Sequence, residues 1–304
     1  MQTARIQIRI APFRNPYTEI IQTSIPMSIH DFSSSTPVVV TRIVNADNLE
    51  HEFGIISSIV DDYLFVSWET AFSGVILRSE GDNDGSFRHE NSSQLYDQLK
   101  RTVEAYKPIQ LGLTLADADG NLPHLDSGNL YVWEFNLKDF DPARDLHTAE
   151  CIESLKGKGV DFEKNRDYGI DSVKFAELLM SSGLVCNPEV VTSVAFHSAY
   201  DFGYLLKMLT GKALPDDLPQ FLLLLETFFG PNVYDVKHLM KHCEGLHGGL
   251  EQVAKTLKVE PAAGKFHLAG ENSLLTWNIF QKIKDLCGGE VEKYSGVIYG
   301  LEPF

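Results

Sequence analysis

The order of the apolar segments along the chain constrains its fold more than any other feature of the sequence. Four short apolar runs typical of strands come first, at 64–68, 74–77, 109–115 and 130–137. The segment Asp119-Gly120-Asn121 between the last two is a hairpin signal. From residue 171 onward, helical patterns alternate with a further strand-like run at 191–196. Strands in hairpin order, followed by strands alternating with helices, predict an α/β fold: a mixed β-sheet with helices on both faces.

The spacing of apolar residues also predicts where the helices lie. Helical patterns cover 49–60, 92–105, 171–181, 202–209, 218–228, 236–243, 249–257 and 274–286. Asp47 or Asn48 is a suitable N-cap for the first of these helices, and Asn272 or Ser273 for the last.

The first 36 residues differ from the rest, which predicts a loose N-terminal extension at 1–36 and one large domain at 37–304. No acidic residue precedes Glu19, and the extension contains a run of three serines. Three arginines before residue 15 leave organelle targeting as a second interpretation. The alternation at 5–10, however, is typical of a strand and not of an amphipathic transit helix.

The net charge and the composition of the chain limit the kinds of molecule that it is expected to bind. The formal net charge is −16, and such a surface repels phosphate at long range. An RNA ligand would therefore need a local groove or delivery by another protein. No apolar run reaches the roughly 18 residues of a membrane span, so we expect a soluble protein. The four cysteines form no CxxC pair, which predicts reduced, mostly buried thiols of an intracellular protein.

Common catalytic and nucleotide-binding motifs are absent: the sequence contains no GxxxxGK[ST], GxGxxG or GxSxG. His238, His242, Cys243 and His247 suggest a metal site, because histidines four residues apart share one face of a helix. One cysteine and an uncertain fourth ligand nevertheless make a poor structural zinc set.

Polar residues at the ends of predicted elements are better candidates for chemistry. Glu69 follows the strand at 64–68, Asp201 stands where a strand gives way to a helix, and His267 and Asn272 precede the last helix. Each also has an ordinary structural interpretation. Asp201 and Asn272 are suitable helix caps, Glu69 could be a solvated surface acid, and His267 could be an ordinary surface or core histidine.

Four segments, 66–74, 196–207, 234–240 and 267–276, together resemble the DEDD-type poly(A)-specific exonucleases of the Caf/Pop type, the deadenylase subunits of the Ccr–Not complex. The resemblance runs from about Val44 to Leu301, and further matching segments lie at 108–114, 177–183 and 245–250. It implies a ribonuclease-H-like fold and metal-dependent 3′→5′ hydrolysis of poly(A) with Mg²⁺ or Mn²⁺. It also implies a Ccr–Not scaffold subunit and poly(A) mRNA as partners, with neither DNA nor membrane, and a cytoplasmic and nuclear location.

The site residues depart from the family pattern. The family's first motif is Asp-Thr-Glu-Phe-Pro-Gly, and here Glu69 and Ala71 stand at its two acidic positions. Asp201 and His267 are kept, whereas Asn272 stands at the last acidic position. By the resemblance, Glu69 and Asp201 are the remaining metal ligands and His267 is a vestigial general base. The five residues should converge on one cleft.

The missing carboxylates bear directly on metal binding. A two-metal site holds its ions about 3.5–4 Å apart, and Mg²⁺ requires a nearly ideal octahedron of oxygens. Ala71 offers no ligand atom, Asn272 offers no charge, and Glu69 is longer than aspartate by one methylene. We therefore expect weak or absent metal binding.

The leading functional hypothesis is a deadenylase-like protein whose catalysis is lost or strongly reduced and which acts through scaffold or RNA contacts. By the resemblance, the helix that contains Met180 faces the scaffold. One alternative is a weak exoribonuclease that uses a single ion, and another is a domain with an unrelated partner, for which 1–36 is the only hint. Phe72, Tyr200 and Phe202 could stack on adenines, although the pattern favours burial for at least two of them.

Overall fold

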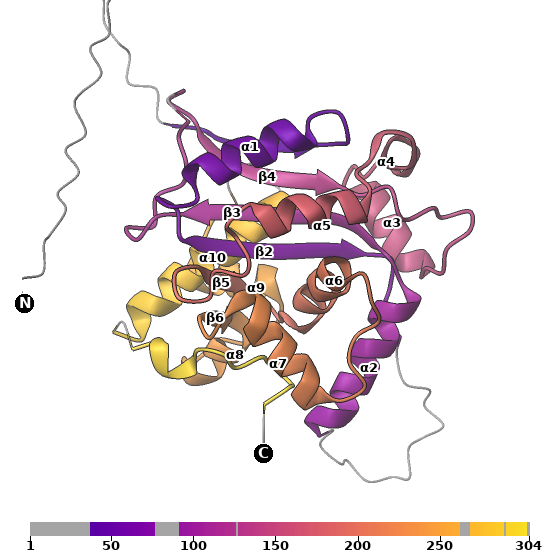
Figure 1. Cartoon of the computed structure of the whole chain (residues 1–304). Coiled ribbons are helices and arrows are strands. Elements are labelled where there is room, and N and C mark those ends of the chain that lie inside the picture. Colours follow the sequence, from indigo (N-terminus) through magenta and orange to yellow (C-terminus); the bar gives the residue numbers. More distant parts are fainter. Residues whose placement is uncertain (1–36, 77–90, 126, 262–267, 289, 303–304) are drawn as a thin grey trace, which may run out of the picture. The chain divides into compact units, whose positions relative to one another are not determined.

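The computed structural model describes residues 37–76, 91–125, 127–261, 268–288 and 290–302 (Figure 1). The predicted extension at 1–36 and the candidate base His267 lie outside these residues, so both stay predictions.

A six-stranded mixed sheet forms the centre of the described part of the chain (Figure 1). Its order is β1-β4-β3-β2-β5-β6. The strands are β1 (Val39–Val44), β2 (Phe65–Phe72), β3 (Pro108–Ala116), β4 (Leu130–Asn136), β5 (Thr192–Ala195) and β6 (Val233–Asp235). The pairs β2/β3 and β3/β4 are antiparallel, whereas β1/β4, β2/β5 and β5/β6 are parallel. The predicted hairpin and the predicted mixed sheet are thus confirmed.

Two strand predictions were wrong. The strand predicted at 64–68 extends to Phe72, so Glu69 lies inside β2 and not after it. Residues 74–76, predicted as part of a strand, are not in one, because Gly74 adopts a φ of 153° and Ser73 turns away to accept the Thr148 N–H on its carbonyl oxygen. The sequence analysis also missed β1.

Helices cover both faces of the sheet. On one face lie α1 (Leu49–Ile59), α2 (Ser92–Ala105), α5 (Ser172–Ser181), α6 (Ala199–Thr210) and α7 (Leu218–Phe229). On the other lie α8 (Val236–Leu239), the short 3-10 helix η2 (Met240–His242), α9 (Leu250–Leu257) and α10 (Ala269–Leu286). Successive strand residues serve opposite faces: buried Trp68 packs with the first group, whereas Phe65 packs against Trp277 of α10. Each face has its own apolar core.

The helices differ from the sequence-based prediction in several places. Helix α6 begins at Ala199 and not at 202, so Asp201 lies in its first turn and is not its cap. The helix predicted at 236–243 is α8 followed by η2. The last helix begins at Ala269, and the Asn272 N–H donates to Leu268 O, so neither Asn272 nor Ser273 is its cap. The structure also contains α3 (Ala149–Gly157) and α4 (Phe162–Tyr168), which the sequence analysis missed. Only Ile152 and Leu155 of α3 are buried, so its apolar spacing is too sparse to predict a helix. A further 3-10 helix, η3 (Glu292–Tyr294), lies near the C-terminus.

Gly112 of β3 allows α10 to lie directly on the sheet. A Cβ atom at this position would be 1.8 Å from the carbonyl oxygen of Ala269. Gly112 is also the partner of Glu69 in the β2/β3 pair. The absence of a side chain at Gly112 therefore brings the first turn of α10, with Asn272, close to Glu69.

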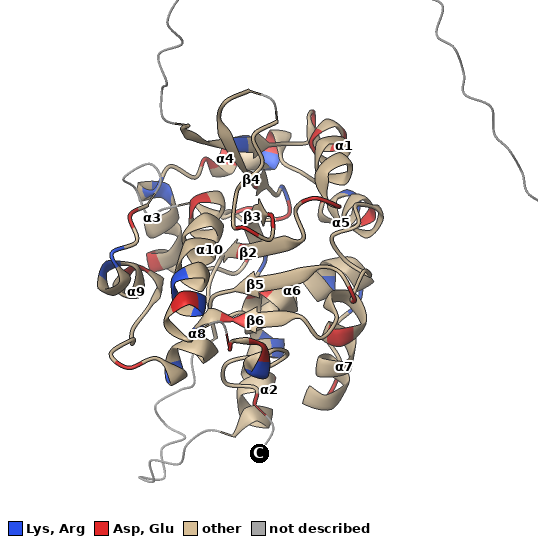
Figure 2. Cartoon of the chain, turned by 90° about the vertical axis from the view of Figure 1, so that its left-hand side faces the viewer, with Lys and Arg blue, Asp and Glu red and all other residues tan. Residues whose placement is uncertain are grey.

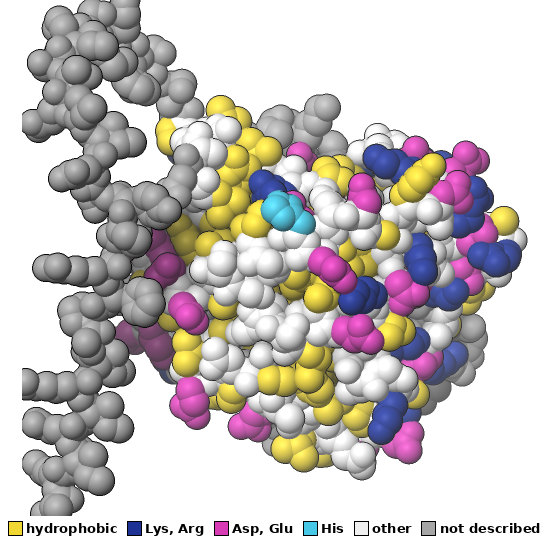
Figure 3. Space-filling view, turned by 45° about the horizontal axis from the view of Figure 1, so that its top comes forward, with side chains coloured by type: hydrophobic (Ala, Val, Ile, Leu, Met, Phe, Trp, Pro, Cys, Tyr) yellow, Lys and Arg dark blue, Asp and Glu magenta, His cyan; other side chains and the backbone are white. Residues whose placement is uncertain are grey.

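Charged side chains of both signs are interspersed on the surface. In Figure 2 the ribbon segments of basic and acidic residues are interspersed along the described part of the chain. Figure 3 shows apolar side chains scattered between charged ones on the side that carries α1. Within the described residues, no helix has the length and apolar character needed to cross a bilayer. The prediction of mostly buried cysteines was wrong, since Cys186 is exposed and the other three are half-buried.

Candidate active site

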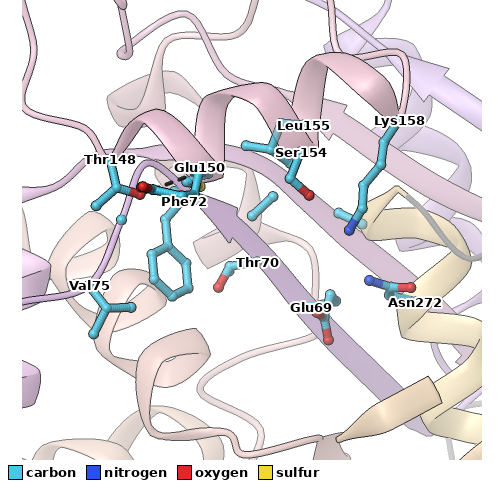
Figure 4. Close-up of a pocket in the computed structure, with 14 residues that line it drawn as sticks. Glu69, Thr70, Phe72, Val75, Thr148, Glu150, Ser154, Leu155, Lys158 and Asn272 are labelled. Atoms are coloured by element: carbon cyan, nitrogen blue, oxygen red, sulfur yellow. Dashed lines mark hydrogen bonds between the residues drawn. The ribbon is translucent and has the colours of Figure 1, made fainter. Parts of the chain in front are cut away.

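Strand β2 and helices α3 and α10 enclose a cavity of about 580 Å³ (Figure 4). Glu69 of β2 and Asn272 of α10 line it from one side, and Ser154 and Lys158 from the other. Ala71 of β2 also lines it. A second cavity, of about 460 Å³, shares Glu69, Lys158 and Asn272 and continues toward α9. These three residues therefore stand where two hollows meet.

Asp201 lies behind this cavity, in the first turn of α6. Its Oδ1 accepts hydrogen bonds from both the backbone N–H and the hydroxyl of Thr70, each at 2.7 Å. The β2/β5 pairing ends at Trp68, so β5 does not use the Thr70 N–H, and the Asp201 carboxylate takes it. Asp201 is only 5% exposed and does not line the cavity.

The carboxyl groups of Glu69 and Asp201 differ from those of an ordinary surface pair, because both of their pKa values are raised. Glu69 reaches solvent through the cavity, yet the surrounding protein and the charge of Asp201 raise its pKa well above the usual value. A side-chain hydrogen bond from Asn272 and the positive charge of Lys158 act in the opposite direction. Burial raises the pKa of Asp201 to about 7, although the bonds from Thr70 lower it and the charge of Asp235 raises it further. The site thus holds more negative charge than its neighbours neutralise.

The donor atoms do not fit a pair of divalent ions. Ala71 presents a methyl group to the cavity, and Asn272, which lines the cavity beside Glu69, offers a neutral amide in place of a carboxylate. One oxygen of Asp201 is already occupied by Thr70. Nowhere in the described part of the chain do three or more His, Cys, Asp or Glu side chains gather as a metal-binding group. Two carboxylates are too few to offset the repulsion between two divalent ions.

The predicted convergence of site residues is observed for three of the five. Glu69, Ala71 and Asn272 share one cavity, and Asp201 is adjacent to it through Thr70. His267 is outside the described residues.

The alternative histidine–cysteine site does not form. His238 contacts Glu302 at 3.1 Å, the ring of His242 stacks on Tyr294 at 3.9 Å, and His247 contacts the carbonyl oxygen of Gly245. The rings of His238 and His242 are neighbours, with centroids 5.3 Å apart, but among the described residues no third His, Cys, Asp or Glu side chain joins them as a metal-binding group.

The three candidate stacking aromatics have different environments. Phe202 is fully buried. Phe72 and Tyr200 are half-buried and stack on each other with ring centroids 5.5 Å apart. The expectation that at least two of the three are buried was wrong, because Phe72 lies at the open end of the cavity.

The sequence analysis missed the contribution of α3 to the site. Thr148, Glu150, Cys151, Ser154, Leu155 and Lys158 line the larger cavity. A usable signal was the segment Lys156-Gly157-Lys158-Gly159, in which two glycines flank a lysine and mark the end of a helix.

A second functional prediction concerns the surface of α5. Met180 is 44% exposed and Val173 is 64% exposed. Both side chains are therefore available to a partner.

Comparison with known proteins places the chain among ribonucleases. The family described as CAF1 family ribonuclease matches residues 44–179. A relative from Arabidopsis thaliana named probable CCR4-associated factor 1 homolog 7 is 48% identical over 262 residues, which cover 86% of this chain and 92% of the relative.

Solved structures agree with this placement. The S. pombe Pop2p structure in its Mg²⁺- and Mn²⁺-bound form superposes with a TM-score of 0.77 at 36% identity, covering 86% of this chain and 99% of that one. A chain in the structure of the yeast NOT1 MIF4G domain co-crystallised with CAF1 gives a TM-score of 0.69 at 32% identity, with 86% and 96% coverage. The predicted ribonuclease-H-like fold is confirmed by these superpositions.

Proposed function

The chain belongs to the CAF1 ribonuclease family, and we propose that it is a deadenylase-like protein of the Ccr–Not mRNA decay machinery with lost or strongly reduced poly(A) cleavage. The observation that carries the proposal is the lining of the cavity by Ala71 and Asn272. Two of the positions at which the family resemblance implies acids therefore offer a methyl group and a neutral amide.

The loss of activity follows from charge. In-line displacement at a phosphodiester needs two ions that stabilise the attacking and leaving oxygens. Glu69 and Asp201 alone do not hold such a pair. The cavity has a volume of about 580 Å³, so a single-stranded RNA end could enter it without being cut.

The retained role is that of a binding partner. A yeast relative was co-crystallised with the NOT1 MIF4G domain, and the exposed Met180 on α5 is our proposed contact with the equivalent scaffold. A chain that occupies this position without cutting RNA would compete with active subunits. Poly(A) mRNA is the second proposed ligand, and we propose a cytoplasmic and nuclear location on the basis of the family.

The direct test is a titration of Mg²⁺ and Mn²⁺ with a labelled oligo(A) substrate. The unmodified protein should leave the substrate intact. The triple variant Glu69→Asp, Ala71→Glu, Asn272→Asp should shorten it, whereas each single reversion should do little because ligands of one metal pair act as a unit. A thermal melt of every variant checks folding. Robust Mg²⁺-dependent shortening by the unmodified protein would refute the proposal.

A second candidate function is weak exonuclease activity with a single ion. The uncompensated charge on Glu69 and Asp201 favours it, since a cation would relieve that charge. In that case slow shortening of oligo(A) should be present and should disappear in Glu69→Gln. Activity that survives this substitution would come from a contaminating nuclease.

The third interpretation is that the chain binds an unrelated partner. A pull-down with the scaffold domain distinguishes it from scaffold binding. Met180→Arg should abolish capture while the variant still melts cooperatively, because the charge is buried unpaired only in the complex. Val173→Arg, a matched change on the same helix, measures the reach of the contact surface. Unchanged capture by both variants would remove α5 from the interface.

A further inference from the structure

Lys158 has a fixed backbone at the end of α3. Its N–H donates to Ser154 O at 3.1 Å and to Leu155 O at 3.2 Å, which closes the helix. Gly159 follows with a φ of 99°, a conformation that favours glycine. Buried Val160 then anchors the chain through its own bond to Leu155 O. The side chain of Lys158 therefore starts from one defined position.

From this position Lys158 reaches the junction of the two cavities. It lines both of them, together with Glu69 and Asn272. Figure 4 shows its ammonium group directed from the α3 side toward Asn272 and Glu69. The positive charge of Lys158 lowers the pKa of Glu69, which burial and the charge of Asp201 raise. It is the smallest of the four influences, so Lys158 offsets the charge of Glu69 only in part.

We infer that Lys158 is a resident cation of the cavity, a partial counter-ion of Glu69 that opposes the binding of a divalent metal ion there. An ion that binds beside Glu69 experiences Coulomb repulsion from the ammonium group, or the lysine must withdraw and give up its own attraction to Glu69. Either route lowers the affinity for the ion. Lysine suits this role because its charge is compact and its stem is flexible.

The inference goes beyond the proposed function, because it concerns a residue outside the positions that the family resemblance implies as ligands. It adds a second cause of weak metal binding to the missing carboxylates. The two causes are separable: restoring ligands adds negative charge, whereas removing Lys158 subtracts positive charge.

The test measures Mn²⁺ binding to the purified full chain by electron paramagnetic resonance, without RNA. Lys158→Met should bind Mn²⁺ roughly three- to tenfold more tightly than the unmodified protein, since one pKa unit of interaction is worth a factor of ten. Lys158→Arg should bind as the unmodified protein does. Lys156→Met is the matched control, because it removes the same charge from an exposed position on the same helix, and it should change the affinity less than twofold.

Three outcomes would overturn the inference: no gain in Lys158→Met, an equal gain in Lys156→Met, or a gain that persists when Glu69→Gln is added. The first result means that Lys158 does not oppose the ion, the second that only the overall surface charge matters, and the third that the ion binds elsewhere. Thermal melts of the variants confirm folding. The readout is binding of the metal alone. The inference about Lys158 is therefore tested independently of the oligo(A) assay, which tests the proposed function.

Discussion

Asp235 and the Glu69–Asp201 pair are both acidic and both lie close to the ends of neighbouring strands, but their environments differ. Asp235 is 1% exposed, and its two oxygens accept five hydrogen bonds, from the backbone N–H groups of His197, Ser198, Lys237 and Tyr299 and from the Ser198 hydroxyl. Asp201 uses one oxygen for two bonds from Thr70. Asn272 and the charge of Lys158 lower the pKa of Glu69, but burial and the charge of Asp201 raise it by more.

The difference in hydrogen bonding suggests different roles: Asp235 stabilises the fold, whereas Glu69 and Asp201 contribute less to it. Buried charges are normally paired or fully hydrogen-bonded because desolvation is costly. Asp235 satisfies this rule, and it holds His197 at a φ of 58°, a conformation that L-residues rarely adopt. Glu69 and Asp201 satisfy it less well, as their raised pKa values indicate, and such a shortage of partners is common among carboxylates of functional sites.

Removing the charge of Asp235 should therefore have the largest effect. In Asp235→Asn the amide nitrogen must face N–H donors, whichever way the amide is turned. We expect a loss of about 3 kcal/mol in the free energy of unfolding, as when a buried hydrogen-bond network is broken. Urea denaturation measures this loss. A loss below about 1 kcal/mol would mean that Asp235 contributes no more to the stability of the fold than Glu69 and Asp201 do.

Glu134 provides an intermediate case, with two donors and no cation. Its carboxylate accepts bonds from Gln110 Nε2 at 3.0 Å and from Gly270 N at 3.3 Å, and burial raises its pKa from 4.5 to about 7. A carboxyl group with a raised folded-state pKa binds its proton more tightly in the folded state. The stability it contributes is present below about pH 4.5 and is lost as the pH rises to about 7.

The Glu134→Gln variant should thus gain on the order of 2 kcal/mol relative to the unmodified protein at pH 8 and nothing at pH 4. Urea denaturation at several pH values measures the difference. A difference that does not vary with pH would mean that Glu134 is not the titrating group.

The sequence predicted the sheet better than it predicted the site. The hairpin of β3 and β4 and most helices follow from apolar spacing, which local sequence encodes. The place of Asn272 does not, because α10 begins at Ala269 only where Gly112, far away in the sequence, leaves room for it. The role of Lys158 was invisible for the same reason: only the fold brings α3 to Glu69. The sequence motifs identified Glu69 of β2 and Asp201 of α6. The residues that surround these two acids come from distant parts of the chain and are seen only in the folded structure.

Replacing Glu69 should have a smaller effect, and one of opposite sign to Asp235→Asn. Its raised pKa means that the ionised side chain destabilises the folded state at neutral pH. Glu69→Gln keeps the shape and removes the charge, so we expect a gain of about 1 kcal/mol at pH 7, in line with other substitutions that relieve a functional site. The gain should vanish near pH 4, and a loss at pH 7 would show that Lys158 and Asn272 already satisfy Glu69.

Asp201→Asn should have the smallest effect, and it is the closest chemical match to Asp235→Asn. The amide can turn its oxygen toward Thr70 and keep both hydrogen bonds that Oδ1 accepts from this residue. The substitution also removes the repulsion that Asp201 exerts on Glu69. The raised pKa of Asp201 means that its charge also costs stability at neutral pH, so we expect a small gain in the free energy of unfolding at pH 7, below about 1 kcal/mol. Urea denaturation of the two Asp→Asn variants under the same conditions compares their free energies of unfolding directly. If Asp201→Asn destabilised the protein as much as Asp235→Asn, Asp201 would be a structural acid, and only Glu69 would remain as a candidate functional carboxylate.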